Sequence, residues 1–296
     1  MAGAAPDRAT AGGTLYVVAT PIGNLGDVTL RALEVLRAVP LIAAEDTRIS
    51  RRLLARYEIA TRAVSFHARS GPARLEELLA HLRGGLDLAL VTDAGTPVVS
   101  DPGGELVAAW AGEGGTVVPI PGASAVLAAV AASGIAGPRW CFEGFLPRSG
   151  LERKERLARI AADDRSTVLF EAPTRLSVTL SDLAAACGDN RSAAVCRELT
   201  KLHEQIVRGS LAALHTAVTD GSIPSRGEIA IVVSGAPAGQ SMVRAGGVTE
   251  PLTINEARGR VAALVRDGMP RSEAARRTAA ETGFGRRRLY RESDSA

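Results

Sequence analysis

The sequence predicts an α/β fold in which helices cover mostly parallel sheets. Short apolar runs rich in β-branched residues recur along the chain. Between them lie stretches whose leucines recur with helical spacing, such as Leu75, Leu78, Leu79 and Leu82. This alternation is typical of parallel strands joined by crossover helices. With 296 residues and 46% apolar content, the chain is long enough for two such units.

The first α/β domain is expected at residues 13–120, after a flexible tail at 1–12 that is rich in Ala, Gly and Pro. Its helices are expected between five short apolar runs. We predict strands at Thr14–Ala19, Leu41–Ala44, Ala63–Phe66, Leu86–Thr92 and Thr116–Ile120.

The second α/β domain is expected at residues 121–234, where the same alternation continues. An Ala-rich helix begins near Ser124. Four strands are predicted at Trp140–Glu143, Thr167–Phe170, Ala193–Arg197 and Glu228–Ser234. Residues 235–250 have the Gly, Ala, Pro and Ser composition of a linker.

A small basic helical module is expected at residues 251–296, with helices at 254–267, 272–281 and 286–291. It holds ten arginines against six acidic residues, a net charge of +4 in a chain whose total is +3. Helix-turn-helix domains are built in this way, so we predict contact with nucleic acid through Arg276, Arg277, Arg286, Arg287 and Arg288. The alternative is an arginine-rich tail used for packing or dimerisation.

The bulk composition narrows the class of protein. No apolar run reaches the ~20 residues that a membrane helix needs, and no signal peptide is recognisable, so we expect a cytoplasmic protein. The three cysteines fit neither a disulfide framework nor a zinc pattern, so neither a disulfide nor a metal is expected.

Several Gly/Pro-rich loops follow predicted strands, which is where open α/β sheets bind ligands. Each loop alone is explained as a turn, but together they indicate a ligand site. No dinucleotide-binding G-x-G-x-x-G follows the first strand, and no phosphate-binding P-loop motif occurs. The loops lie at Thr20–Asn24, Asp93–Pro97, Ser100–Gly103 and Pro119–Ser124.

Seven ordered motifs in the chain resemble those of the bacterial small-subunit ribosomal RNA cytidine 2′-O-ribose methyltransferases. This family belongs to the tetrapyrrole-methylase-like class of S-adenosylmethionine enzymes. The motifs are Gly13–Asp27, Glu45–Arg48, Ser65–His67, Thr92–Gly103, Pro121–Ala125, Phe142–Pro147 and Arg197–Lys201.

The resemblance implies two α/β domains of the tetrapyrrole methylase type, with S-adenosylmethionine in the cleft between them, and a homodimer. It also implies a small C-terminal helical module. Pro21 would approach the cofactor or the cleft, and Asp93 would lie at the start of the main cofactor loop. The remaining cofactor-binding positions carried over by motif are Ala94, Gly95, Thr96, Val99, Ser124 and Ala125, while Glu171 and Leu199 of the second domain occupy positions that face the cofactor in the wider class.

Methyl transfer to a ribose hydroxyl needs alignment of the reacting atoms and a base or cation near the oxygen. Lys201, one of only two lysines, is a candidate for either role beside Glu198, provided that burial lowers its pKa for the role of base. The alternative is a surface lysine paired with Glu198 or Glu204. His67 is expected to be a structural histidine rather than a proton carrier.

Asp46 and Arg48 are further candidates, because they lie just after the end of the second predicted strand. Asp46 would accept a proton and Arg48 would hold an RNA phosphate. The competing interpretation is that Asp46 caps the following helix. Asp101, before Pro-Gly, is also expected to cap a helix.

A structured RNA, either 16S ribosomal RNA or the small ribosomal subunit, is the expected partner. Aromatic residues make up only 3% of the chain, which disfavours a base-stacking platform and favours phosphate and 2′-hydroxyl contacts. Arg148 is expected to line the RNA groove. The alternatives are a tetrapyrrole or other small-molecule methylase of the same fold, and a non-catalytic RNA-binding protein.

Overall fold

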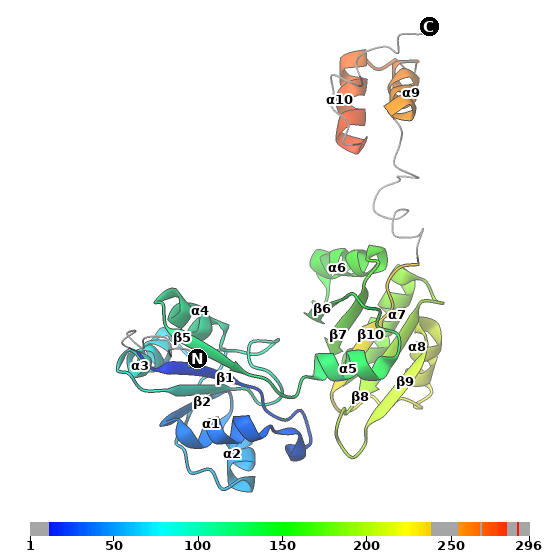
Figure 1. Cartoon of the computed structure of the whole chain (residues 1–296). Coiled ribbons are helices and arrows are strands. Elements are labelled where there is room, and N and C mark those ends of the chain that lie inside the picture. The colour runs from blue at the N-terminus through cyan, green and yellow to red at the C-terminus, as the bar shows by residue number, and fades with distance from the viewer. Residues whose placement is uncertain (1–11, 238–253, 267, 283–288, 290–296) are drawn as a thin grey trace, which may run out of the picture. The chain divides into compact units, whose positions relative to one another are not determined.

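A computed structural model describes residues 12–237, 254–266, 268–282 and 289 (Figure 1). The chain divides into two compact units, one at 1–161 with 165–235 and the other at 162–164 with 236–296. The first unit holds two five-stranded sheets. The second holds two helices of the C-terminal module.

The first sheet has the order β3-β2-β4-β1-β5, and all its neighbouring strands are parallel. All five predicted strands are confirmed, with ends within two residues of those expected. All residues of β2 and β4 are buried, as in other parallel sheets that helices cover on both faces. The strands are β1 (Thr14–Val18), β2 (Leu41–Ala44), β3 (Ala63–Ser65), β4 (Leu88–Val91) and β5 (Thr116–Ile120).

Two hydrophobic clusters lie on opposite faces of this sheet. Helices α1 (Leu30–Ala38) and α2 (Thr47–Arg56) pack on one face, where Leu36 and Leu53 meet Ile42. Helices α3 (Pro72–Arg83) and α4 (Gly104–Gly112) cover the other face (Figure 1). A short 3-10 helix, η1 (Leu25–Asp27), precedes α1. This layering brings the carboxyl ends of the strands, and the loops that follow them, to one edge of the sheet.

The second sheet has the order β6-β7-β10-β8-β9 and is mixed, so the expectation of mostly parallel strands is wrong here. Only β6 and β7 are parallel, and the other three neighbouring pairs are antiparallel. The loop between β8 and β9 is too short for a crossover, which forces an antiparallel pair. The strands are β6 (Trp140–Phe145), β7 (Ser166–Glu171), β8 (Ser192–Arg197), β9 (Gln205–Ser210) and β10 (Ile229–Val233).

Sequence analysis missed β9, because its residues are half-buried or exposed and carry no continuous apolar run. The other four strands of this sheet occupy the predicted segments. One face of the sheet packs against α5, and the other carries the larger hydrophobic cluster with α6, α7 and α8. These helices are α5 (Ala125–Ser133), α6 (Gly150–Ala162), α7 (Leu176–Cys187), which follows the 3-10 helix η2 (Pro173–Arg175), and α8 (Leu211–Thr219).

The second unit contains α9 (Ile254–Arg266) and α10 (Arg271–Thr282), as predicted. Ala257 and Val261 of α9 pack against Ala274 and Ala275 of α10. Leu289 joins this cluster, while the rest of the third predicted helix lies outside the described residues. In the part of the chain that the structure describes, no helix is long and apolar enough to span a bilayer.

Candidate functional site

Two adjoining cavities lie in the first unit, and Ile22, Ala94 and Glu228 line both. The larger cavity has a volume of about 380 Å³ and the smaller about 280 Å³. Residues of both sheets and of the loops that follow their strands contribute to the lining. The loops in which the sequence predicts a ligand site therefore line a pair of cavities with a common wall.

One side of the larger cavity is formed by the loop after β4. Gly95 has a φ of 84°, and Val98 and Ser100 have φ values of 74° and 65°, which are unusual for residues with a side chain. Thr20 fixes this loop, since its backbone exchanges hydrogen bonds of 2.8 and 3.0 Å with Gly95. Strained backbone held by such contacts is common at ligand sites.

The amino end of α5 forms a second side of the larger cavity. The Ser124 hydroxyl accepts a hydrogen bond of 3.4 Å from the Leu127 amide and caps α5, the helix that the sequence predicts to begin near Ser124. Ala125 follows it as the first helical residue. The Thr96 hydroxyl donates to the Ala123 carbonyl at 3.4 Å, which ties the β4 loop to this helix.

The opposite side comes from the second sheet and is largely apolar. Phe145 and Phe170 lie 5.7 Å apart between ring centres, and Leu199 lines the same cavity. Cys196 also faces it, and burial raises the pKa of its thiol to about 11, which keeps the thiol protonated at neutral pH. The larger cavity thus combines apolar walls with exposed backbone polar groups, as is common in cofactor sites.

Glu171 lines the larger cavity, but its carboxylate is hydrogen-bonded and ion-paired to nearby residues of the second α/β domain. The side chain is fully buried, and it accepts hydrogen bonds from the Thr179 hydroxyl at 2.6 Å and the Ala172 amide at 2.8 Å. Arg175 lies 3.5 Å from the same carboxylate. These contacts hold the turn after β7 in place beside the cavity.

Asp101 lines the larger cavity and does not cap α4, contrary to expectation. The helix starts at Gly104, and its cap is Gly103, whose φ of 113° suits only glycine. Burial raises the pKa of Asp101 to about 6. The hydrogen bond with Thr92 lowers this pKa, whereas the negative charges of Glu45 and Asp93 raise it further. Asp101 is therefore the ionisable group of the larger cavity that changes charge near neutral pH.

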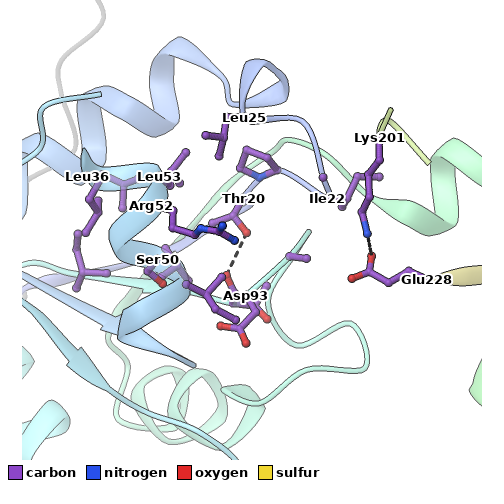
Figure 2. Close-up of a pocket in the computed structure, with 18 residues that line it drawn as sticks. Thr20, Ile22, Leu25, Leu36, Ser50, Arg52, Leu53, Asp93, Lys201 and Glu228 are labelled. Atoms are coloured by element: carbon purple, nitrogen blue, oxygen red, sulfur yellow. Dashed lines mark hydrogen bonds and ion pairs between the residues drawn. The ribbon is translucent and has the colours of Figure 1, made fainter. Parts of the chain in front are cut away.

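The smaller cavity has an apolar floor and a polar rim (Figure 2). Buried side chains of the first sheet and its helices, including Leu36, Ile42 and Leu53, form the floor. Other lining residues carry hydroxyl or charged groups. These are Thr20, Ser50, Arg52, Thr92, Asp93, Lys201 and Glu228.

Lys201 bridges two carboxylates at the smaller cavity. Its ammonium lies 2.9 Å from Glu198 and 3.1 Å from Glu228, toward which it points in Figure 2. Burial by itself lowers the pKa of Lys201, but the hydrogen bonds with Glu198 and Glu228 outweigh it and raise the pKa. The lysine is therefore a fixed cation, and the lowered pKa that a base would need is not present.

The turn that carries Lys201 is strained and tightly held. Glu198 and Thr200 have φ values of 52° and 67°. Glu198 accepts hydrogen bonds from Lys201 and from the Glu228 amide at 2.8 Å, and these two contacts lower the pKa of Glu198. Glu198 thus remains an anion that positions Lys201.

Asp46 caps α2, which was one of its two predicted roles. Its carboxylate accepts a hydrogen bond from the Arg48 amide at 2.8 Å and pairs with the Arg48 guanidinium at 2.5 Å. The hydrogen bonds from Arg48 lower the pKa of Asp46 to about 2, so it is a poor proton acceptor at neutral pH. Neither residue lines either cavity.

The structure brings most predicted cofactor residues together. Pro21 and Asp93 line the smaller cavity, and Ala94 lines both. Burial, followed by the charge of Glu45, raises the pKa of Asp93, which accepts a hydrogen bond from the Asp46 amide. The larger cavity is lined by Gly95, Thr96, Val99, Ser124, Ala125, Glu171 and Leu199 in addition to Ala94.

The predicted RNA-binding residue Arg148 lines neither cavity. Arg148 is exposed before α6, and Arg276 and Arg277 are exposed on α10, where Arg276 lies 3.6 Å from Glu273. Arg286, Arg287 and Arg288 lie outside the described residues. The exposed His67 accepts a hydrogen bond from the Arg69 amide and lines neither cavity.

Sequence analysis missed Ser50, Arg52 and Glu228 as site residues. Ser50 and Arg52 sit within an amphipathic helix, where a serine or arginine carries no motif of its own. Glu228 directly precedes β10 and meets Lys201 only in the folded chain.

The fold and site define a class. A family model described as Tetrapyrrole (Corrin/Porphyrin) Methylases matches residues 14–215. Solved structures share the fold, including a cobalamin biosynthetic enzyme, cobalt precorrin-4 methyltransferase, with a TM-score of 0.59 and 20% identity over 75% of this chain and 94% of that chain. Uroporphyrin-III C-methyltransferase from Thermus thermophilus, described as complexed with S-adenyl homocysteine, gives a TM-score of 0.54 at 20% identity over 75% and 97%.

Curated relatives are more similar in sequence. A protein from Synechocystis sp. named "Ribosomal RNA small subunit methyltransferase I" is 46% identical, over 94% of this chain and 96% of the relative. A protein of the same name from Pseudomonas aeruginosa is 41% identical over 95% and 96%. The chain belongs to the tetrapyrrole methylase family, and within it to the group of ribosomal RNA small subunit methyltransferase I proteins. The resemblance drawn from the motifs is confirmed.

Proposed function

We propose that the protein transfers a methyl group from S-adenosylmethionine to the ribose 2′-hydroxyl of a cytidine in 16S ribosomal RNA. The observation that carries the proposal is the larger cavity, because its lining collects eight residues that the family motifs assign to the methyl donor. Relatives named for ribosomal RNA methylation support the substrate class.

The larger cavity suits S-adenosylmethionine in chemistry. Phe145, Phe170 and Leu199 offer apolar contact to a purine ring, and the carboxylates of Asp101 and Glu228 suit a cationic ligand. A Cβ on Gly95 would lie 3.3 Å from Ile22, so glycine keeps the backbone open to a ligand. When bound, S-adenosylmethionine supplies an electrophilic methyl group.

The common wall of the two cavities is the place where donor and acceptor groups would meet. Ile22 and Ala94 exclude water there by their apolar side chains. Lys201, fixed by Glu198 and Glu228, would stabilise negative charge that develops on the ribose oxygen. In this role Lys201 acts as a cation. The proton of the ribose hydroxyl is then accepted by a group other than Lys201.

A small-molecule methylase is not favoured as the alternative. The macrocycle methylases match at about 20% identity, which supports the fold alone, whereas relatives named for ribosomal RNA are 41–46% identical over most of the chain.

Labelled methyl transfer tests the proposal. Full-length protein and S-adenosylmethionine are incubated with small ribosomal subunits from a strain that lacks the protein, and nuclease digestion locates the label. Label on a cytidine ribose is the expected result. Absence of transfer to the subunit and to its free RNA, with binding of S-adenosylmethionine demonstrated, would refute it.

We further propose that residues 251–296 dock the RNA, and that the protein works in the cytoplasm as a homodimer. The net charge of +4 in this segment supports electrostatic docking. Deletion of 251–296 should weaken RNA binding and its salt dependence while affinity for S-adenosylmethionine is kept. Unchanged RNA affinity would rule out the docking role.

A further inference from the structure

Helix α2 carries a buried polar group that the fold leaves without a partner. Ser50 is only 8% exposed, and its hydroxyl has no hydrogen-bond partner among the described residues. A buried hydroxyl left in this way destabilises the folded chain, because it has lost its hydrogen bonds with water. Ser50 lines the smaller cavity, so a bound molecule there would supply the missing hydrogen bond.

The walls around Ser50 suit a flat group with a polar edge. Leu25 and Ile49, which are 37% and 42% exposed, offer apolar surface in this lining. Thr20 and Asp93 contribute a hydroxyl and a carboxylate elsewhere in the same lining. A pyrimidine base has this combination of apolar faces and a donor–acceptor edge, and carboxylates accept hydrogen bonds from the cytosine amino group.

The outer side of α2 is basic. Arg51 and Arg52 are exposed, and their side chains form no ion pair or hydrogen bond within the described parts of the chain. The side chain of Arg48, by contrast, is held by Asp46. Arg52 also lines the smaller cavity, and Figure 2 shows its side chain reaching from α2 toward Thr20. An exposed guanidinium at the rim of a cavity is well suited to bind a phosphate.

We propose that the smaller cavity receives the target nucleoside of the RNA, turned out of its stack, with two residues of α2 selecting it. The Ser50 hydroxyl hydrogen-bonds to the base, and Arg52 pairs with a phosphate next to it. The ribose then lies at the common wall beside Lys201, next to the larger cavity. This inference rests on the proposed function and assigns Ser50 and Arg52 as specificity-determining residues.

Kinetics of full-length variants test the two roles. Ser50→Ala should lower kcat/KM for small ribosomal subunits about tenfold, the effect of roughly 1.4 kcal/mol, and Ser50→Thr, which keeps the hydroxyl, should restore most of it. Arg52→Ala should raise the KM about tenfold with little change in kcat, because a phosphate contact contributes equally to ground state and transition state. Affinity for S-adenosylmethionine should remain that of the wild type in all three variants.

Arg159→Ala is the matched control for charge, because Arg159 is exposed on α6 and lines neither cavity. Wild-type kinetics in both Ser50→Ala and Arg52→Ala would overturn the inference, as would an equal loss in Arg159→Ala and Arg52→Ala. A loss in Ser50→Ala that Ser50→Thr does not restore, or a loss of cofactor affinity, would overturn the hydrogen bond assigned to Ser50.

Photocrosslinking tests the location independently. A benzophenone amino acid replaces Leu25, which lines the smaller cavity, or Leu30, which is 80% exposed and lines neither cavity. After irradiation with small subunits, the benzophenone at position 25 should crosslink to the methylated nucleotide or its neighbours, and the one at position 30 should not.

The two proposals fail in different ways. If wild-type protein methylates the RNA but the position-25 crosslinks map away from the methylated nucleotide, the inference is wrong and the function stands. If wild-type protein transfers no methyl group to any ribosomal RNA, the function is wrong, and the inference falls with it. Methylation of a macrocycle in place of RNA would likewise refute both.

Discussion

The two adjoining cavities are built from different parts of the chain. One side of the larger cavity is built from backbone and small residues, such as Gly95, Ser124 and Ala125, and the opposite side from apolar side chains of the second sheet. The smaller cavity is defined by long or charged side chains, including Arg52 and Lys201, over an apolar floor. A backbone-built cavity is rigid and tolerates little change in its loops, whereas a side-chain-built cavity is adjustable in specificity.

This difference predicts that substitutions in the two cavities separate cofactor binding from turnover. Changes in the loop after β4 should act on affinity for S-adenosylmethionine. Changes around Lys201 should act on turnover at unchanged cofactor affinity. Variants of each cavity test whether cofactor affinity and turnover respond separately.

Gly95→Val should have the largest effect. A valine at a φ of 84° is strained, and its Cβ would lie 3.3 Å from Ile22, so the loop must move into or away from the larger cavity. We expect affinity for S-adenosylmethionine to fall at least ~100-fold, or roughly 2.8 kcal/mol, measured by isothermal titration calorimetry.

Gly71→Ala is the control for Gly95→Val, since Gly71 has a φ of −72° and a Cβ there meets nothing within 4 Å. Circular dichroism checks that both variants fold. Wild-type affinity in a folded Gly95→Val variant would show that the larger cavity does not hold the methyl donor.

Lys201→Met should reduce turnover with little change in cofactor affinity. It removes the cation between Glu198 and Glu228 and leaves two carboxylates near the common wall. Loss of one group that stabilises developing charge lowers kcat about 100-fold. Single-turnover methyl transfer measures it, and Lys154→Met, which changes the other lysine on the surface of α6, serves as control. Equal rates in the two variants would remove Lys201 from the mechanism.

Gly23→Ala should produce a smaller effect through the same lysine. A Cβ at Gly23 would lie 2.4 Å from Cγ and 2.8 Å from Cε of Lys201, so the lysine must change its rotamer. Because misplacement of a catalytic group by about 1 Å can cost up to about 100-fold, we expect a loss of about tenfold in kcat. In Gly112→Ala, where a Cβ meets nothing within 4 Å, the rate should stay at the wild-type value.

Asp101→Asn should have the smallest effect, and on stability rather than on chemistry. The pKa of Asp101 is raised from 3.8 to about 6, so the folded state binds the proton more tightly than the unfolded state. The contribution of Asp101 to stability is therefore greatest below about pH 4 and is lost as the pH rises through 6. Allowing for partial solvent exposure, the loss is about 1 kcal/mol.

Urea denaturation at pH 5 and pH 8 measures this contribution. Asp101→Asn should be more stable than wild type at pH 8, and the difference should shrink at pH 5. A difference that is the same at both pH values would contradict the raised pKa.

Much of the fold was predictable because its signals are local. The five strands of the first sheet each contain consecutive apolar or β-branched residues, and Asp46 and Ser124 cap α2 and α5 as their sequence context indicates. β9 was not predictable, because only Ile206 and Val207 are consecutive apolar residues and every position of this edge strand is half-buried or exposed. Its antiparallel pairing with β8 changes the whole second sheet from parallel to mixed.

The candidate site divides in the same way. The loops of the larger cavity were recognisable, since Gly95 and Ser124 belong to motifs in which backbone conformation is encoded by neighbouring residues. The pKa of Asp101 is raised first by its burial and then by the charges of Glu45 and Asp93, and that of Lys201 is raised by hydrogen bonds with Glu198 and with Glu228, which is distant in the sequence. Sequence analysis therefore found Lys201 but proposed a lowered pKa, and it gave Asp101 the role of a cap.

By itself, the sequence determined most of the strands and helices in their order, the loops that line the larger cavity and the family of the protein. These depend on residues close together in the chain, where apolar periodicity, capping and glycine conformation act. The tertiary structure alone decided that Ser50 is buried without a partner among the described residues and that Lys201 is clamped between two carboxylates. Burial and charge pairing arise only when distant segments pack together, because both depend on neighbours that the chain order does not reveal.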